Sequence, residues 1–254
     1  MQTIDKQTVQ SLRHVLLKAR GPGRGTEEDY DKAYSFWLEM WRSTFSEVQA
    51  DINLQSDMFL TQREVSAIFM GDQVVALQMF DFRDLRLKAH RDLSYFRHFP
   101  SEVLKLLLDQ GYEQVMSLGQ MTVHPDWRRN KVGPFMSEVL AGIAINRFLS
   151  TSAAVMVAIT RNDRSTQELG YRFGAVPLRR GHEAYGIPSD VIVIQRDKAK
   201  GTEMAGMATI IDRLWRESRV ARLFSDLPPA LNRNTADNDL DVVLVNESRI
   251  AHTR

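Results

Sequence analysis

The segment 121–136, MTVHPDWRRNKVGPFM, most constrains the fold, because it predicts a strand that turns directly into a helix. Val123 closes a β-branched run, and Pro125 ends it. The first N–H groups of a helix have no partners within the helix, and three basic side chains between residues 128 and 131 surround them here. Gly133 would let the backbone approach a ligand closely. The segment therefore predicts a turn that binds a diphosphate, the alternative being a basic turn with a structural role only.

The same residues resemble a known signature. Val123-x-Pro-x-Trp-Arg-Arg-Asn-Lys-Val-Gly133 is similar to the acyl-CoA motif of the GNAT superfamily of N-acetyltransferases, Arg/Gln-x-x-Gly-x-Gly/Ala, which cradles the pyrophosphate of coenzyme A. Arg128 and Gly133 match the first and last motif positions, whereas Lys131 stands in place of the middle glycine. The resemblance implies coenzyme A binding by Met121, Val123, Arg128, Arg129, Asn130, Lys131, Val132, Gly133 and Asn162.

A second segment extends the resemblance. Residues 153–159 predict a buried strand, and residues 164–173 predict a short helix ended by Gly174. In the superfamily this helix runs beside the pantetheine arm, and many members carry a tyrosine four residues before the glycine, where it protonates the leaving thiolate. Here that position is Gly170, and Tyr171 is shifted by one residue, which turns a helical side chain by about 100°.

An insertion separates the predicted hairpin, strands 64–70 and 73–82, from the strand 113–123, and residues 85–99 and 101–108 within it are helix-like. Acyl-homoserine lactone synthases and N-acyl amino acid synthases, which share the GNAT core, carry helices near this place and a phrase similar to Phe99-Pro-x-x-Val-Leu-Lys-Leu-Leu-Leu108. Their Glu-x-x-Arg pair corresponds here to Ser117 and Gln120. This departure argues against a homoserine lactone product and leaves other long-chain N-acyl transfers open.

Three residues are candidates for catalysis. His124 follows the strand end nearest the expected thioester and could accept an amine proton, although a histidine in a loop is commonly just solvated. Tyr171 is the nearest tyrosine to the thiolate-protonating position. Gln120 lies on the strand expected to bind pantetheine through its backbone, where alternate side chains would face the acceptor.

Composition limits the remaining functions. The chain of 254 residues has no cysteine, which excludes a cysteine nucleophile and implies direct transfer of the acyl group to its acceptor. A net charge of +1 gives no general attraction to nucleic acid. We found no metal-ligand spacing, no signal-peptide pattern and no stretch long and apolar enough to cross a membrane, so the cytoplasm is the expected location.

The pattern along the chain predicts three parts. Residues 1–25 form an N-terminal helical arm, with a helix over 5–20. Residues 26–198 form the GNAT-like domain, with the helical insertion at 83–111 and a first helix that Thr26 and Asp29 begin as a capping box. Residues 199–254 form an appendage with a helix over 203–224, a polar segment 232–241 and an edge strand or docking segment at 242–245.

We therefore expect an α/β, GNAT-like fold with a mixed, splayed central sheet flanked by helices, an N-terminal helical segment and a C-terminal helical appendage. The expected function is N-acyl transfer from an acyl-CoA thioester, acetyl-CoA or longer, to a small amine acceptor. Alternatives are a long-chain N-acyl amino acid synthase-like enzyme that uses acyl carrier protein, and a non-catalytic module that binds an acyl thioester or a protein. A homodimer is possible under any of these.

Overall fold

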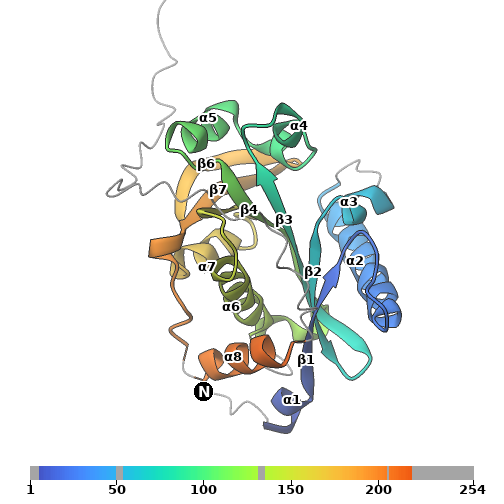
Figure 1. Cartoon of the computed structure of the whole chain (residues 1–254). Coiled ribbons are helices and arrows are strands. Elements are labelled where there is room, and N and C mark those ends of the chain that lie inside the picture. Colours follow the sequence, from blue (N-terminus) through green and yellow to red (C-terminus); the bar gives the residue numbers. More distant parts are fainter. Residues whose placement is uncertain (1–5, 50–53, 131–134, 205, 219–254) are drawn as a thin grey trace, which may run out of the picture.

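A computed structural model describes residues 6–49, 54–130, 135–204 and 206–218 (Figure 1). Seven strands form one sheet in the order β1-β2-β3-β4-β5-β7-β6. Neighbouring strands are antiparallel except for β4 and β5, which are parallel. The strands are β1 Leu12–Lys18, β2 Glu64–Met70, β3 Gln73–Asp84, β4 Gln114–Val123, β5 Val155–Arg161, β6 Val176–Ala184 and β7 Ile187–Gln195.

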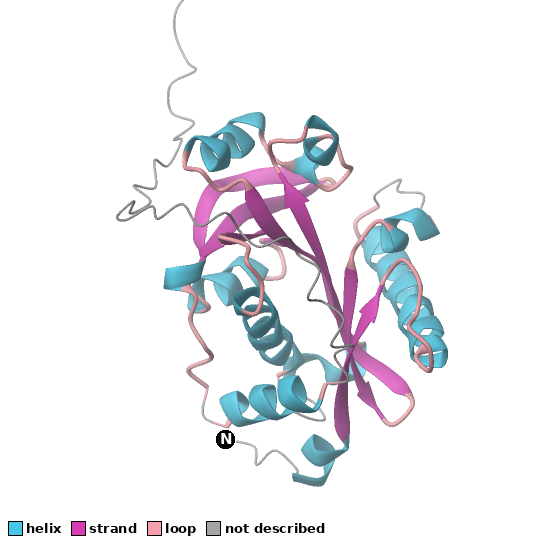
Figure 2. Ribbon diagram, in the orientation of Figure 1, coloured by secondary structure: helices cyan, strands magenta, loops and turns pink. Residues whose placement is uncertain are grey.

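Helices cover both faces of this sheet (Figure 2). The α-helices are α1 Lys6–Ser11, α2 Glu27–Glu47, α3 Ser56–Leu60, α4 Lys88–Arg91, α5 Ser101–Asp109, α6 Met136–Leu149, α7 Thr166–Arg172 and α8 Met207–Glu217. Short 3-10 helices are η1 Phe96–His98, η2 Pro125–Asn130 and η3 Arg196–Lys198. On one face α2 and α3 pack on β1 to β3, while η1 and α5 pack on β4, β5 and β7; on the other face lie α6, α7 and α8.

Alternation along each strand sends neighbouring side chains to opposite layers. Met79 of β3 packs with Trp37 of α2, whereas the next residue, Phe80, packs with Phe148 of α6. Helix α6 is also tied to the sheet by a buried ion pair, in which the Arg147 guanidinium donates to both carboxylate oxygens of Glu64 on β2 at 2.7 Å each. Removing one partner would leave a buried charge alone, so this pair fixes where α6 lies on the sheet.

Several expected elements are confirmed. The hairpin of β2 and β3 turns at Gly71, whose φ is +57°. The strands expected at 113–123 and 153–159 are β4 and β5, and α7 ends before Gly174, whose φ of +91° suits a helix C-terminus. The C-terminal appendage contributes α8, which packs so closely on α6 that a Cβ at Gly142 would collide with Ile211. The segments expected at 232–241 and 242–245 lie outside the described residues.

Other expectations were wrong. The helix expected over 5–20 ends at Ser11, and Leu12–Lys18 form a strand that pairs with β2, because its side chains are buried alternately in both layers of the core. In place of the single helix expected over 85–99, the structure has two short helices, α4 and η1. Thr26 makes no capping box, since its hydroxyl donates to the Gly23 carbonyl and Asp29 instead pairs with Arg13.

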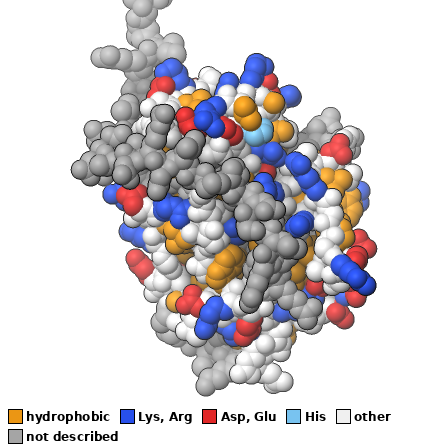
Figure 3. Space-filling model, in the orientation of Figure 1, with side chains coloured by type: hydrophobic (Ala, Val, Ile, Leu, Met, Phe, Trp, Pro, Cys, Tyr) orange, Lys and Arg blue, Asp and Glu red, His pale blue; other side chains and the backbone are white. Residues whose placement is uncertain are grey.

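Charge on the surface is mixed. Acidic and basic side chains are interspersed over the face in Figure 3. Several lie one helical turn apart and pair, for example Lys88 with Asp92 at 2.6 Å and Lys105 with Asp109 at 2.5 Å. Within the described residues no helix is long and apolar enough to span a membrane.

A buried histidine lies between β1 and the C-terminal helix. His14 is 3% exposed, its Nε2 lies 2.9 Å from the Ser66 hydroxyl, and its ring stacks on Trp215 of α8. Burial lowers the pKa of His14 to about 4, below its ordinary value of 6.5, because the charged form loses its hydration. His14 therefore stays neutral in the folded protein at mildly acidic pH.

We predict that acid weakens the fold through His14. Between pH 6.5 and about 4 the unfolded chain binds a proton at His14 that the folded chain does not, so stability falls as the pH falls, by up to roughly 3 kcal/mol. His14→Gln should flatten the pH dependence of the free energy of unfolding over this range, measured by urea denaturation. His90→Gln, which removes a partly exposed histidine, is the control. Equal pH slopes in both variants and the wild type would contradict the prediction.

Candidate active site

The parallel strands β4 and β5 separate halfway along their length. They pair only where Val115–Leu118 meet Val155–Ala158, and both continue past this region without each other. Strand β4 also carries a bulge, because its register with β3 shifts between Leu77 and Met79 and Gln120 has a φ of +53°. A bulge re-aims side chains and bends the strand away from its neighbour. The result is a wedge-shaped opening in the middle of the sheet.

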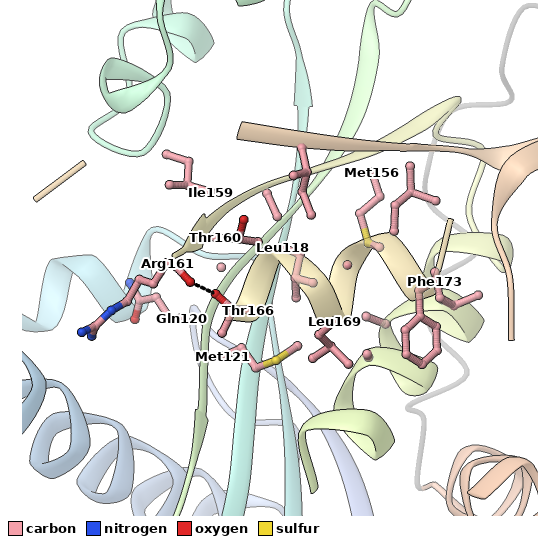
Figure 4. Close-up of a pocket in the computed structure, with 18 of the residues that line it drawn as sticks. Leu118, Gln120, Met121, Met156, Ile159, Thr160, Arg161, Thr166, Leu169 and Phe173 are labelled. Atoms are coloured by element: carbon pink, nitrogen blue, oxygen red, sulfur yellow. Dashed lines mark hydrogen bonds between the residues drawn. The ribbon is translucent and has the colours of Figure 1, made fainter. Parts of the chain in front are cut away.

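A cavity of about 140 Å³ fills this opening on the face of α6 and α7 (Figure 4). Its wall is mostly apolar. The residues that line it from β4, β5, β7, α6, α7 and α2 are Leu118, Gly119, Gln120, Met121, Met156, Ala158, Ile159, Thr160, Arg161, Ile192, Ile194, Ala141, Ala144, Ile145, Thr166, Leu169, Gly170, Phe173 and Trp41.

Small side chains leave room for the cavity. Ala141 and Ala144 face it from α6, Ala158 from β5 and Gly170 from α7. A Cβ at Gly170 would run into the Cδ1 atom of Ile192 in the present packing. The glycine where many GNAT members carry tyrosine is thus part of the cavity wall, and this position has no hydroxyl to offer.

The two ends of the cavity differ in polarity. In Figure 4, Met156, Leu169 and Phe173 lie toward one end, while Gln120 and Arg161 lie toward the other. Each polar group is held by a neighbour. The Gln120 side-chain oxygen accepts from the Trp37 indole N–H, and the Arg161 guanidinium donates to both oxygens of Asp163 at 3.0 and 2.7 Å. An apolar chain therefore fits one end and a polar reacting group the other.

A second cavity, of about 90 Å³, lies on the opposite face of the sheet, between α2 and the insertion. It is lined by Trp41, Phe45, Leu54, Met58, Tyr95, Gly119, Gln120, Ile159, Arg161, Ala184, Tyr185, Ile187 and Ser189. Trp41, Gly119, Gln120, Ile159 and Arg161 line both cavities. The Tyr95 hydroxyl, from the insertion, donates to the Leu118 carbonyl at 3.0 Å, at the point where β4 and β5 part. The opening in the sheet therefore has one chamber on each face.

Tyr171 and Asn162 meet away from the cavities, at Asp190 of β7. The Tyr171 hydroxyl donates to one Asp190 oxygen at 2.6 Å, and the Asn162 amide and the Gly181 N–H donate to the other at 2.9 Å each. Burial raises the pKa of Asp190, but the hydrogen bonds from Tyr171 and Asn162 outweigh it, so the pKa lies below its ordinary value. Burial and the bond to Asp190 raise the pKa of Tyr171 above its ordinary range. Both side chains thus fasten α7 and its preceding turn to β7.

The remaining candidates are dispersed. His124 lines a separate surface hollow with Phe36 and Gln73, and neither cavity in the sheet includes it. Arg128 turns back, and its Nε donates to the Val123 carbonyl at 2.9 Å. Arg129 and Asn130 belong to η2, and Lys131, Val132 and Gly133 lie outside the described residues. Of the candidate site residues that the structure describes, Gln120 and Met121 line the cavity.

Sequence reasoning missed several residues that line the opening. Trp41 lies on α2 and lines both cavities. Tyr95 comes from the insertion, Tyr185 from the turn between β6 and β7, and Arg161 from the end of β5. Only Arg161 gave a signal, as a charged residue at the end of an apolar strand. Within the described residues no group of three histidine, aspartate or glutamate side chains could hold a metal.

Comparisons with known proteins bear on the fold. No protein-family model matches the chain, and neither does any curated protein sequence. Among solved structures the chain is similar to FeeM, an N-acyl amino acid synthase from uncultured soil microbes, with a TM-score of 0.53 and 13% identity over 74% of this chain and 93% of that one. The chain has the GNAT fold. The resemblance stated from the sequence is confirmed at the level of the fold.

Two further solved structures are also similar. BjaI, a CoA-dependent acyl-homoserine lactone synthase, has a TM-score of 0.49 and 14% identity over 80% of this chain and 89% of that one. LasI, an acyl-homoserine lactone synthase, has a TM-score of 0.48 and 11% identity over 73% of this chain and 90% of that one. At 13% identity the similarity to FeeM describes a shared fold, and the chemistry must be argued from the site.

For the acyl transfer expected from the sequence, we predict that Tyr171→Phe lowers turnover less than tenfold, because its hydroxyl is committed to Asp190 and Tyr171 does not line the cavity. The variant should instead lose stability, by about 1–3 kcal/mol, since a buried carboxylate loses a hydrogen bond. Steady-state kinetics and a thermal melt check the two effects together. A hundredfold loss of turnover with donor binding intact would show that the hydroxyl serves the thiolate after all.

Proposed function

We propose that the chain is an N-acyltransferase that moves an acyl group from a thioester directly to an amine. The observation that carries this proposal is the opening between β4 and β5, which has a cavity on each face of the sheet with Gly119 and Gln120 in both walls. A thioester that enters from the side of α6 and α7 and an amine that enters from the side of α2 would meet at Gly119 and Gln120.

Strand β4 supports donor binding in this arrangement. Past Leu118, none of the described strands pairs with the β4 edge that faces β5. The amide groups of a pantetheine arm can hydrogen-bond to such an edge as an added strand would. One backbone N–H of this edge, near Gln120 rather than at Val123, which lines neither cavity, would then polarise the thioester carbonyl, as an oxyanion hole does.

The reaction needs little beyond this placement. The neutral amine nitrogen attacks the carbonyl carbon, the carbon–sulfur bond breaks, and the thiolate leaves and takes up the proton that the nitrogen loses. Holding the two reactants in contact supplies most of the rate enhancement. With no cysteine in the chain, a cysteine thioester intermediate is excluded and direct transfer fits.

For the donor we propose an acyl-CoA, with acyl carrier protein as the second candidate. The basic turn at 128–131 would bind the diphosphate of coenzyme A, and its charges could equally meet an acidic carrier protein. The apolar wall of the cavity, with Ala141, Ala144 and Gly170 in it, favours an acyl group longer than acetyl. The long-chain branch of the superfamily therefore fits better than the acetyl branch.

We predict that donors gain affinity with chain length, by up to about 0.8 kcal/mol for each methylene that the cavity buries. Ala144→Leu should fill part of the cavity and lower kcat/KM for octanoyl-CoA at least tenfold, while acetyl-CoA changes less than threefold. Leu149→Phe adds bulk to the exposed end of the same helix and serves as the control. Thiol release with an amine panel is the assay. Equal affinity for acetyl and palmitoyl donors would limit the enzyme to small groups.

The choice of donor can be tested at the basic turn. We predict that Arg128→Ala weakens coenzyme A at least tenfold in calorimetric titration, because a charge-assisted hydrogen bond contributes about 1.5–3 kcal/mol. Pantetheine, which lacks the diphosphate, should lose little. Since Arg128 also caps the end of β4, a thermal melt must show that the variant is folded.

Turnover with acyl carrier protein thioesters but not with coenzyme A thioesters would reverse the order of the two proposed donors. Tight thioester binding without turnover would favour the non-catalytic module.

A further inference from the structure

Two polar side chains, Gln120 and Arg161, belong to the walls of both cavities and lie toward the same end of the first one (Figure 4). They come from the two strands that part, since Gln120 is on β4 and Arg161 ends β5. A neighbour fixes one edge of each polar group. An indole N–H can only donate, so Trp37 meets the Gln120 oxygen, and the Gln120 amide nitrogen lies on the other side of its group.

Both side chains keep hydrogen-bond donors that no described residue takes. The Gln120 amide nitrogen has no partner, and neither has Nη1 of Arg161, because Asp163 accepts from Nε and Nη2. These two nitrogens keep accessible surface, whereas the indole nitrogen of Trp41 is enclosed. Donors of this kind in a cavity wall are available to an acceptor atom of a ligand.

The place of these donors points to the reacting atoms. Because Gln120 and Arg161 border both chambers, they lie where the thioester and the amine would meet, rather than at the far end of either chamber. None of the described residues that line the two cavities is an aspartate or glutamate that would compete for the donors. In the proposed reaction, negative charge develops at the meeting point on the carbonyl oxygen.

We infer that the Gln120 amide and the Arg161 guanidinium are catalytic groups that donate to the oxyanion of the tetrahedral intermediate. The inference rests on the proposed function and adds two side chains to its backbone N–H. As the amine nitrogen adds to the carbonyl carbon, the π electron pair moves onto the oxygen, and the two donors stabilise the resulting charge. When the carbonyl re-forms, the carbon–sulfur bond breaks, and the thiolate leaves with the bonding pair and takes up the proton that the nitrogen loses.

The amide is tested by Gln120→Glu, which keeps an oxygen for the Trp37 indole and replaces the nitrogen with a second oxygen. With the best thioester and amine, kcat should fall by about a hundredfold or more, as on removal of an oxyanion donor. Gln120→Met, which removes the donors and adds no charge, should lower kcat at least tenfold. A thioether analogue of the donor has no carbonyl, so its dissociation constant should change less than threefold in calorimetric titration. Gln114→Glu, at the exposed start of β4, is the matched control.

The guanidinium is tested by a pair of variants. Arg161→Met should lower kcat at least tenfold, and Arg161→Lys should recover part of the loss, because an ammonium group keeps the charge. The Asp163 side chain is 41% exposed, so the lost ion pair contributes little to stability, and a thermal melt should show both variants folded. Arg164→Met is the matched control, since Arg164 lies in the same turn, pairs with Glu47 and lines neither cavity.

Two results would overturn the inference while leaving the acyltransferase assignment in place. One is an unchanged kcat in folded Gln120→Glu or Arg161→Met protein. The other is a higher KM for the amine at unchanged kcat, which would assign the donors to the acceptor instead of the oxyanion. An absence of turnover in the wild type with every donor and amine would reject the proposed function, and the inference with it.

Discussion

The separation of β4 from β5 is the constraint on which the rest of the structure depends. Two parallel strands that stayed paired would close the sheet, and neither cavity would reach the other face. The bulge at Gln120 bends β4 away after only four paired residues, and Tyr95 occupies the point of divergence by donating to the Leu118 carbonyl. Backbone groups of β4 that a neighbouring strand would otherwise use thereby have no partner strand among the described residues.

An opening in a sheet survives only if the surrounding layers hold its edges apart. On the β4 side, α6 is tied to the sheet by the Glu64–Arg147 ion pair, and on the β5 side α7 and its preceding turn are tied to β7 through Asp190. Tyr171 and Asn162 therefore have a structural role, because both donate hydrogen bonds to Asp190 although neither lines the cavity. A residue that resembles a catalytic position in sequence here contributes to the frame of the site.

The sequence predicted the strands and helices better than it predicted which residues line the cavities. Local signals were enough for the β2–β3 hairpin, for β4, β5 and for the end of α7 at Gly174, because each is set by residues close together in the chain. The strand at Leu12–Lys18 was missed because its pairing with β2 joins residues about fifty positions apart, and local periodicity carries no information on that. Local periodicity also could not predict that Trp41, Tyr95 and Tyr185 line one cavity, because they lie in three distant parts of the chain and meet only when it folds.

In the proposed reaction, the two chambers also restrict how the amine can lose its proton. None of the described residues that line either cavity is a carboxylate or a histidine, and His124 lies in a different hollow. A site without a base in contact with the amine must receive it already neutral or pass its proton to water. Apolar walls favour the neutral form, because a charged ammonium group would lose its hydration on entry. The apolar chamber beside α2 would thus favour the neutral, reactive form of the acceptor.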